Sequence, residues 1–325
     1  MGFAAWLARR LAYAAGLLAA VAILNFSLMH LAPGDIVQTI VGEMGGASEE
    51  TIAQLKKSYG LDRSFPEQLG LYLKRVATGD LGNSAYYNQP VLKLILERVP
   101  ATVLLVTTAL GLAITVGTFL GVMAARFPAS WLGAFVTIVA LFGFSAPVFW
   151  SGLMLLLLFA SVFELLPASG MYDIAQGATG FAYALDVAYH LVLPAGTLAL
   201  IYLALYSRLS RASMLEVLGS DYVRTARAKG LSENKVVFKH ALRNAILPVV
   251  TVAGLQLSAM LAGAVLVETV FTWPGMGQLA FESILRRDNQ LILGILLLSA
   301  VLVIVGNLLT DLAYRLVDPR IKTGG

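Results

Sequence analysis

The residues that offer the most specific chemistry lie between Asp221 and Pro248, in the segment DYVRTARAKGLSENKVVFKHALRNAILP. This segment is charged and helix-forming, and it separates two apolar runs that are long enough to cross a bilayer. A polar segment of this length between membrane spans is either a solvated connector or a docking surface for a cytosolic molecule. Its content favours docking, so the chemistry we expect is recognition of a partner.

Local signals within the segment predict two short helices joined by a sharp turn. Tyr222–Lys229 has a helical composition, and Gly230 can adopt the positive φ that ends a helix. Ser232 is placed to cap a second helix, with Glu233 in its first turn. Short basic helices also attract anionic lipid head groups, so charge alone leaves lipid binding as an equal alternative.

The composition places the chain in a membrane. Of its 325 residues, 58% are hydrophobic and 13% charged, and the apolar residues form long uninterrupted blocks. The absence of cysteine excludes disulfides, thiolate metal sites and cysteine nucleophiles. His30, His190 and His240 are scattered along the chain, so we expect no metal site.

Apolar runs of roughly 17–25 residues predict an all-α polytopic protein with about six transmembrane helices. The third run is overlong, and Pro147 within it predicts a kink, a tilt or an end before Phe163. The fourth run is short. The six runs are Leu11–Leu31, Ala101–Ala125, Trp131–Phe163, Leu191–Tyr206, Leu247–Val270 and Leu291–Leu312.

These runs divide the chain into a first transmembrane helix within residues 1–31, an external loop with short helices over 32–100, and a core region over 101–315. The core contains the cytoplasmic loop 211–246. Within the external loop, SEETIAQLKKSYGL predicts a short amphipathic helix that begins at Ser48. We expect the whole chain, 1–325, to form a single transmembrane domain.

The positions of Lys and Arg predict the orientation. Arg9 and Arg10, Arg126, the basic loop around Lys229 and the C-terminal basic residues all fall on one side, which places both termini in the cytoplasm. The third-to-fourth connection carries acidic residues without Lys or Arg. The Arg pair before an apolar run is also typical of a signal peptide, but the run is longer than a usual signal core and no A-x-A site follows.

The spans contain no Asp, Glu, Lys or Arg near their middle, where ion-coupled carriers usually place ionisable groups. The chain also has no G-x-x-x-x-G-K-[ST] stretch that would hold a nucleotide phosphate. Energy would then come from a partner that hydrolyses ATP.

The segment resembles the EAA loop of binding-protein-dependent ABC importer permeases. In that pattern Gly230 is the glycine, and Thr225 with Ala226 fall at the two preceding alanine positions. YVRTARAKGLS followed by HALRNAILPVVT is closest to the dipeptide, oligopeptide and nickel branch. The general family has I-x-L-P about ten residues after the glycine, whereas this chain has His240, Ala241, Leu242 and Arg243, as in the peptide-branch variant.

The resemblance extends along nearly the whole chain, because the family's landmarks occur in their order. They are APGD from Ala32, GDLGNS from Gly79, ERVPAT from Glu97, SAPVFW from Ser145, LPASG from Leu166, LPAGTLAL from Leu193, RLSRASMLEVL from Arg208, VETVFTWPGMG from Val267 and LVDPRI from Leu316.

This resemblance implies a non-catalytic permease subunit with a type I ABC importer transmembrane architecture in the bacterial inner membrane. Its implied partners are a second homologous permease, two ABC ATPase subunits, an external substrate-binding protein and the lipid membrane, with no nucleic acid. The chain itself would bind no cofactor, and ATP and Mg would sit on the ATPases. The implied ATPase-coupling residues are Asp221, Tyr222, Thr225, Ala226, Arg227, Ala228, Lys229, Gly230, Leu231, Ser232, His240, Arg243 and Asn244.

The implied cargo is a short peptide, with nickel chelates and glutathione-like peptides left open. A secondary carrier or a membrane scaffold is the alternative from another class of protein. A permease pair of two different chains is favoured over two copies of one chain.

Simple structural interpretations are preferred for several single residues. Glu268 is interpreted as a solvated residue at a span end and Trp273 as an interfacial anchor, and a place at the external mouth is the alternative for both residues. Pro100 and Pro194 are placed near span starts. Gly111, Gly117 and Gly121 are expected to permit close helix contacts, and Trp150 to be an interfacial or packing aromatic.

Overall fold

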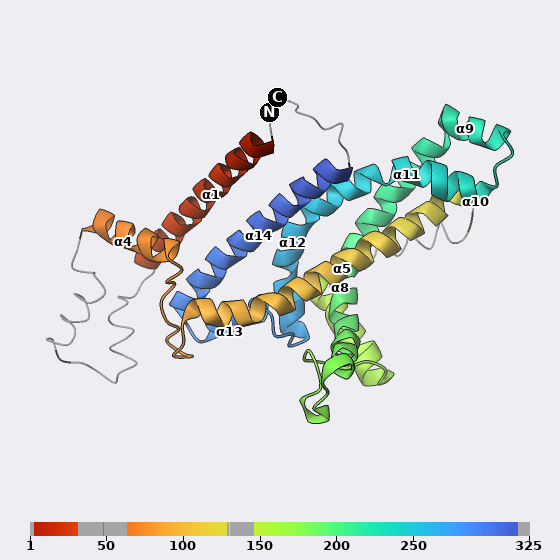
Figure 1. Cartoon of the computed structure of the whole chain (residues 1–325). Helices are drawn as coiled ribbons and strands as arrows, with labels where there is room; N and C mark the ends of the chain where they lie inside the picture. The colour runs from red at the N-terminus through yellow and green to blue at the C-terminus, as the bar shows by residue number, and fades with distance from the viewer. Residues whose placement is uncertain (1–2, 32–47, 49–63, 129, 131–145, 318–325) are drawn as a thin grey trace. The chain divides into compact units, whose positions relative to one another are not determined.

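A computed structural model describes residues 3–31, 48, 64–128, 130 and 146–317 of the chain. Within these residues the structure is helical, and its β pairing is limited to one isolated bridge between Asn83 and Pro90 (Figure 1). The amphipathic helix expected from Ser48 and the first part of the third span, residues 131–145, lie outside the described residues.

Five helices are long and apolar enough to cross a membrane, and they correspond to five of the six expected spans. They are α1 (Phe3–Leu31), α5 (Val91–Arg126), α8 (Gly180–Leu218), α12 (Leu247–Val270) and α14 (Asn289–Val317). The described part of the third span is a shorter apolar helix, α7 (Val148–Leu156), which continues as η1 (Leu157–Val162) with i→i+5 hydrogen bonding. It ends before Phe163, and Pro147 directly precedes its first residue.

Two expected spans are shorter than the helices that contain them. α5 begins at Val91 and not at Ala101, and α8 extends beyond Leu191–Tyr206 at both ends. Pro100 and Pro194 therefore lie inside helices, and their placement near span starts was wrong. Each interior proline removes one i→i−4 hydrogen bond from its helix.

The chain forms two compact units. The first comprises residues up to Ile95 together with Ser283–Leu302, and the second comprises Leu96–Glu282 together with the residues from Val303. The expectation of a single domain over 1–325 stays a prediction.

In the first unit, α1 is held by polar and aromatic contacts. Asn25, buried in α1, donates from Nδ2 to the carbonyl of Leu293 in α14 at 3.1 Å. Phe26 stacks edge-on with Phe65 at the start of α4 (Phe65–Ala77), and His30 Nε2 lies 2.9 Å from Gln68 Oε1. These contacts fix α1 against both neighbours.

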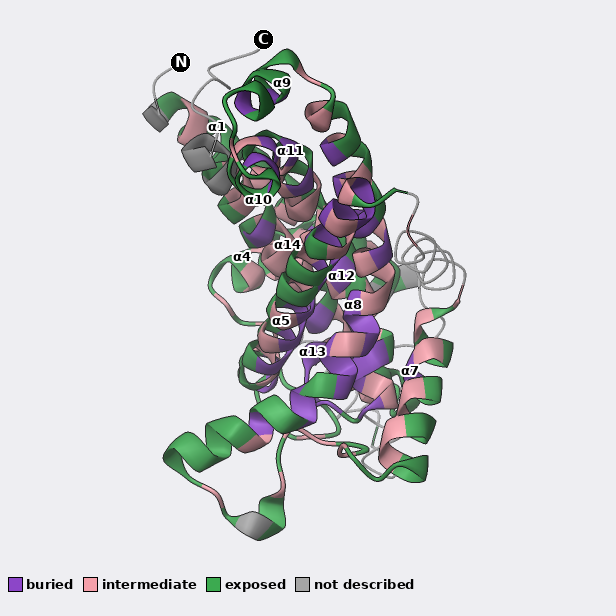
Figure 2. Cartoon of the chain, turned by 90° about the vertical axis from the view of Figure 1, so that its right-hand side faces the viewer, coloured by how far each residue is buried: buried purple, intermediate pink, exposed green. Residues whose placement is uncertain are grey.

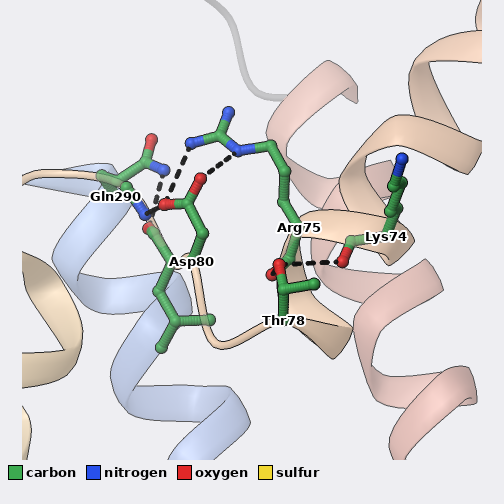
Figure 3. Close-up of polar contacts among 7 residues, drawn as sticks. Lys74, Arg75, Thr78, Asp80 and Gln290 are labelled. Atoms are coloured by element: carbon green, nitrogen blue, oxygen red, sulfur yellow. Dashed lines mark hydrogen bonds and ion pairs between the residues drawn. The ribbon is translucent and has the colours of Figure 1, made fainter.

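The segment that follows α4 is held in place by the carboxylate of Asp80 and the side-chain amide of Gln290 (Figure 3). Asp80 Oδ2 accepts from Arg75 Nε at 2.8 Å, and Oδ1 accepts from the N–H of Gly82 at 2.9 Å. These hydrogen bonds, the guanidinium first, hold the pKa of Asp80 below its usual value. Gln290 Nε2 at the start of α14 donates to the carbonyl of Leu81 at 2.9 Å.

The second unit has a core between α5, α7, α8 and α12. Figure 2 shows many buried residues along α8, and the largest fully buried side chains of this core include Leu105, Leu198, Tyr206 and Met260. α5 and α8 approach closely at two of the three glycines singled out above. A Cβ on Gly117 or Gly121 would press into the α8 backbone, whereas a Cβ on Gly111 would meet no neighbouring atom within 4 Å.

Candidate functional site

The segment singled out in the sequence folds as expected into helix, turn and helix. The first helix, α9 (Asp221–Ala228), begins after Ser220, whose extended backbone is typical of an N-cap. Val223 and Ala226 are three residues apart and buried, so α9 turns one apolar edge inward. They join a second core cluster of the same unit with Val122 and Met214 from the ends of α5 and α8.

The turn after α9 depends on Gly230. Its φ is +76°, a left-handed conformation that an L side chain rarely adopts. Its N–H donates to the carbonyl of Arg227 at 2.9 Å, and the next N–H, of Leu231, reaches the carbonyl of Ala226 at 3.4 Å. No neighbouring atom lies within 4 Å of the position of a Cβ, so backbone conformation and not crowding requires glycine here.

The return arm consists of α10 (Glu233–Lys235), the i→i+5 stretch η3 (Val236–Ala241) and α11 (Leu242–Ala245), and it leads directly into α12. Ser232 occupies the N-cap position of α10 as expected, although its side chain makes no capping hydrogen bond. Val236 and Val237 are fully buried and contact the same cluster as α9. Asn244 Nδ2 donates to the hydroxyl of Tyr222 at 2.8 Å, which joins the return arm to α9.

Two ion pairs neutralise part of the charge on this surface. Arg224 pairs with Asp221, and Arg227 makes a two-point contact with Glu233, with N···O distances of 2.7 and 3.2 Å. The Arg227 guanidinium lowers the pKa of Glu233, and the carboxylate raises that of Arg227. The two side chains are 41% and 46% exposed, so solvent screens the pair and it contributes little to the stability of the fold.

The structure brings all the implied coupling residues together in this one segment, but not all on its surface. Ala226 is buried, and Leu231 and His240 are half-buried. The exposed members are Asp221, Tyr222, Thr225, Arg227, Ala228, Lys229, Gly230, Ser232, Arg243 and Asn244.

Glu268 and Trp273 differ from the simple interpretations given above. Both are fully buried, with 0% of their surface exposed, so Glu268 is not a solvated residue and Trp273 is not an interfacial anchor. The indole Nε1 donates to the carbonyl of Ala101 at 2.9 Å. This partner, 172 residues away in sequence, gives the indole the acceptor that it requires when buried. A role for either residue at an external mouth stays a prediction.

Within the described residues, no group of three or more His, Asp or Glu side chains is arranged to hold a metal ion.

Two family models together match most of the chain. The model of the binding-protein-dependent transport system inner membrane component matches residues 117–323, and the model of the N-terminal part of such membrane components matches residues 3–106. The chain belongs to this family. The match places α9 and the Gly230 turn inside the inner membrane component model.

Curated members of the family are similar along almost their whole length. The dipeptide transport system permease protein DppB of Alkalihalophilus pseudofirmus is 41% identical, covering 98% of this chain and 99% of that protein. DppB of Escherichia coli K12 is 42% identical, covering 93% of this chain and 94% of that protein. The di/tripeptide transport system permease protein DppB of Pseudomonas aeruginosa is 42% identical and covers 98% of each.

The fold is also similar to that of a solved ABC transporter chain. A chain of the MetNI methionine ABC transporter, in an inward-facing conformation, aligns with a TM-score of 0.54 at 17% identity, covering 70% of this chain and 97% of that chain. The all-α transmembrane architecture of an ABC importer is thus confirmed for this permease.

Proposed function

We propose that this permease subunit imports short peptides across the bacterial inner membrane as part of an ATP-driven ABC transporter. The observation that carries the substrate class is the end-to-end similarity, at 41–42% identity, to permeases named for dipeptide and di/tripeptide transport. A second homologous permease, two ABC ATPases and an external binding protein complete the assembly.

The exposed surface of α9 and its turn is the proposed ATPase contact. Val223 and Ala226 anchor α9 to the core, while Tyr222, Thr225 and Lys229 face outward. Because α9 is fixed through buried side chains and the Asn244–Tyr222 hydrogen bond, a push on its outer face moves the helix as a body. Closure of the ATPases on nucleotide would then be converted into alternating access of the permease pair.

The chain supplies no catalytic group to this cycle. ATP and Mg bind to the ATPases, and the permease neither hydrolyses ATP nor transports by itself. Both termini and α9 lie on the cytoplasmic side in this proposal, as the distribution of Lys and Arg predicts.

Reconstitution into liposomes tests the proposal. The complete assembly, with ATP on the ATPase side, is expected to import labelled dipeptide delivered by the binding protein, and a set without the ATPases is expected to import none. Equal uptake by the two sets, or uptake abolished only by a protonophore, would instead identify a secondary carrier. Substrate-stimulated ATP hydrolysis distinguishes a transporter from a scaffold, and ligand binding to the external protein distinguishes peptides from nickel chelates and glutathione-like peptides.

A further inference from the structure

Three sequence landmarks far apart in the chain meet in one buried cluster around Glu268. ERVPAT supplies Thr102, whose hydroxyl donates to Glu268 Oε1 at 2.7 Å. LPASG supplies Gly170, whose N–H donates to the carbonyl of Phe271 at 2.9 Å. VETVFTWPGMG supplies Glu268 itself and the turn that follows it. None of these landmarks lies in the proposed ATPase-coupling segment.

The carboxylate of Glu268 is satisfied on both oxygens. Oε2 accepts from the N–H groups of Gly277 and Gln278, at 2.6 and 3.2 Å, in the first turn of α13 (Met276–Leu285). Thr102 contacts both α12 and α13, because its hydroxyl oxygen also accepts from the N–H of Met276 at 2.8 Å. The carboxylate thereby joins the end of α12, the beginning of α13 and the first third of α5.

The turn between α12 and α13 is shaped to fit this carboxylate. A Cβ on Gly275 would overlap the carboxylate of Glu268, and a Cβ on Gly277 would lie 2.5 Å from Val265 Cα. The N–H of Trp273 donates to the carbonyl of Glu268 at 2.8 Å, and its indole reaches Ala101 in α5. Glu268, Thr102, Trp273 and the turn with Gly275 and Gly277 thus hold the end of α12 and the start of α13 against α5, and we call this cluster the joint.

One helix connects this joint to the coupling segment. α12 begins at Leu247, immediately after the return arm, and its 24 residues run without a break to Val270, about 36 Å at 1.5 Å per residue. A single continuous helix therefore links the return arm to Glu268, and the hydrogen bonds of Glu268 and Thr102 link that helix to α5 and α13.

We propose that Glu268 and Thr102 are positioning residues for transport. They make α5, α12 and α13 move as one body. A movement of the coupling segment driven by the ATPases then opens and closes the translocation path at the far end of α12. The inference rests on the proposed function, since it assigns these residues to the cycle of an ATP-driven permease.

The test replaces Thr102 by Val, which keeps the shape of the side chain and removes its donor and acceptor. Two buried groups then lose their partner, Glu268 Oε1 and the Met276 N–H. In the reconstituted assembly we expect basal ATP hydrolysis to be retained and the number of peptides imported per ATP to fall about tenfold. Thr102→Ser keeps the hydroxyl and is expected to restore the ratio.

Thr118→Val is the matched control. Thr118 is buried on the same helix, and its hydroxyl makes no hydrogen bond in the described part of the chain. The same substitution is therefore expected to leave the transport ratio unchanged at position 118. Equal ratios for Thr102→Val and the wild type, or equal losses at the two positions, would overturn the proposal. If Thr102→Val does not assemble, the isosteric Glu268→Gln variant takes its place. Its amide has one oxygen, so in either orientation one donor loses its acceptor, the Thr102 hydroxyl or the Gly277 N–H.

A second measurement does not depend on the substrate. The native chain has no cysteine, so spin labels placed at Val162 and Phe281, which are 62% and 43% exposed, report one distance within the second unit. ATP is expected to change this distance in the wild type and in Thr118→Val, but not in Thr102→Val. If the wild type shows the change without importing peptide, the proposed substrate fails and the joint stands; an identical change in Thr102→Val rejects the joint.

Discussion

The hydroxyl of Tyr222 on α9 accepts a hydrogen bond from Nδ2 of Asn244 on α11 at 2.8 Å, across 22 residues of sequence. Tyr222 remains 43% exposed, so the contact fixes the orientation of the ring without hiding its face. The ring of Tyr222, a residue of the proposed ATPase contact, is thus oriented by the arm that leads into α12.

Loss of this contact is expected to weaken coupling modestly. Tyr222→Phe removes the hydroxyl and keeps the ring, and the hydrogen bond contributes about 0.5–1.5 kcal/mol. The affinity for the ATPases, measured by titrating purified ATPase onto the permease pair in nanodiscs, should fall about two- to tenfold. Asn244→Ala should give the same loss, and the double variant should lose no more than either single variant, because both remove one bond.

Substitution of Gly230 is expected to act through backbone conformation alone. Gly230→Ala and Gly230→Val force a side chain into φ +76°, at a cost of about 1–2 kcal/mol in the turn, although the space beside the residue is open. Membrane insertion should be intact while ATPase association and uptake fall. Gly230→Asn is the control, since asparagine tolerates this conformation better. Normal transport by Gly230→Val would show that the turn is not the coupling element.

The turn and its flanking helices could be predicted from sequence because their determinants are local. A glycine after a helical stretch, a serine at the next N-cap and apolar residues three apart are visible in a short window. The start of α5 was missed for a different reason. Lys93, Glu97 and Arg98 lower the apolar content of its first turns, yet Val91, Leu94 and Ile95 are buried at helical spacing, a pattern that a periodicity count would have found.

The cluster around Glu268 could not have been predicted in this way. Its main partner, Thr102, is 166 residues away, and the acceptor of the Trp273 indole is 172 residues away. A carboxylate near the end of an apolar run has the same local sequence whether it faces water or a buried hydroxyl. Only the packing of α5 against α12 and α13 distinguishes the two environments.

A pH dependence is expected in the segment after α4. The pKa of Asp80 is lowered in the folded state, first by Arg75 and then by the Gly82 N–H. The stabilisation it provides is therefore complete above the unfolded-state pKa, about 3.9, and is lost as the pH falls through the folded-state value. Hydrogen exchange of residues 79–90, corrected for the intrinsic rate, should rise over that window. Asp80→Asn should remove the pH dependence; a variant that keeps it would assign the effect to another group.

The proposed orientation gives a direct labelling result. With no native cysteine, Ser232→Cys should resist a membrane-impermeant maleimide in intact spheroplasts and react after permeabilisation. Asp173→Cys, in the acidic connection before α8, should react in intact spheroplasts. The reverse pattern would place α9 outside, away from any ATPase.

A second buried carboxylate, Asp288, is expected to be important for stability in the first unit. It is 3% exposed, and its Oδ2 accepts from the Ser84 hydroxyl at 2.5 Å and from the Tyr86 N–H at 3.3 Å. Its Oδ1 accepts from the Leu291 N–H at 3.1 Å and so caps α14.

Asp288→Ala leaves these donors without an acceptor, and we expect a loss of about 2–4 kcal/mol. Thermal unfolding of the purified permease should shift down by several degrees. Ser84→Ala, which removes one donor and leaves the cap on Leu291, should shift it by less than half as much, because Asp288 keeps its two backbone partners. An Asp288→Ala midpoint equal to that of the wild type would show that the carboxylate does not hold residues 84–86 to the start of α14.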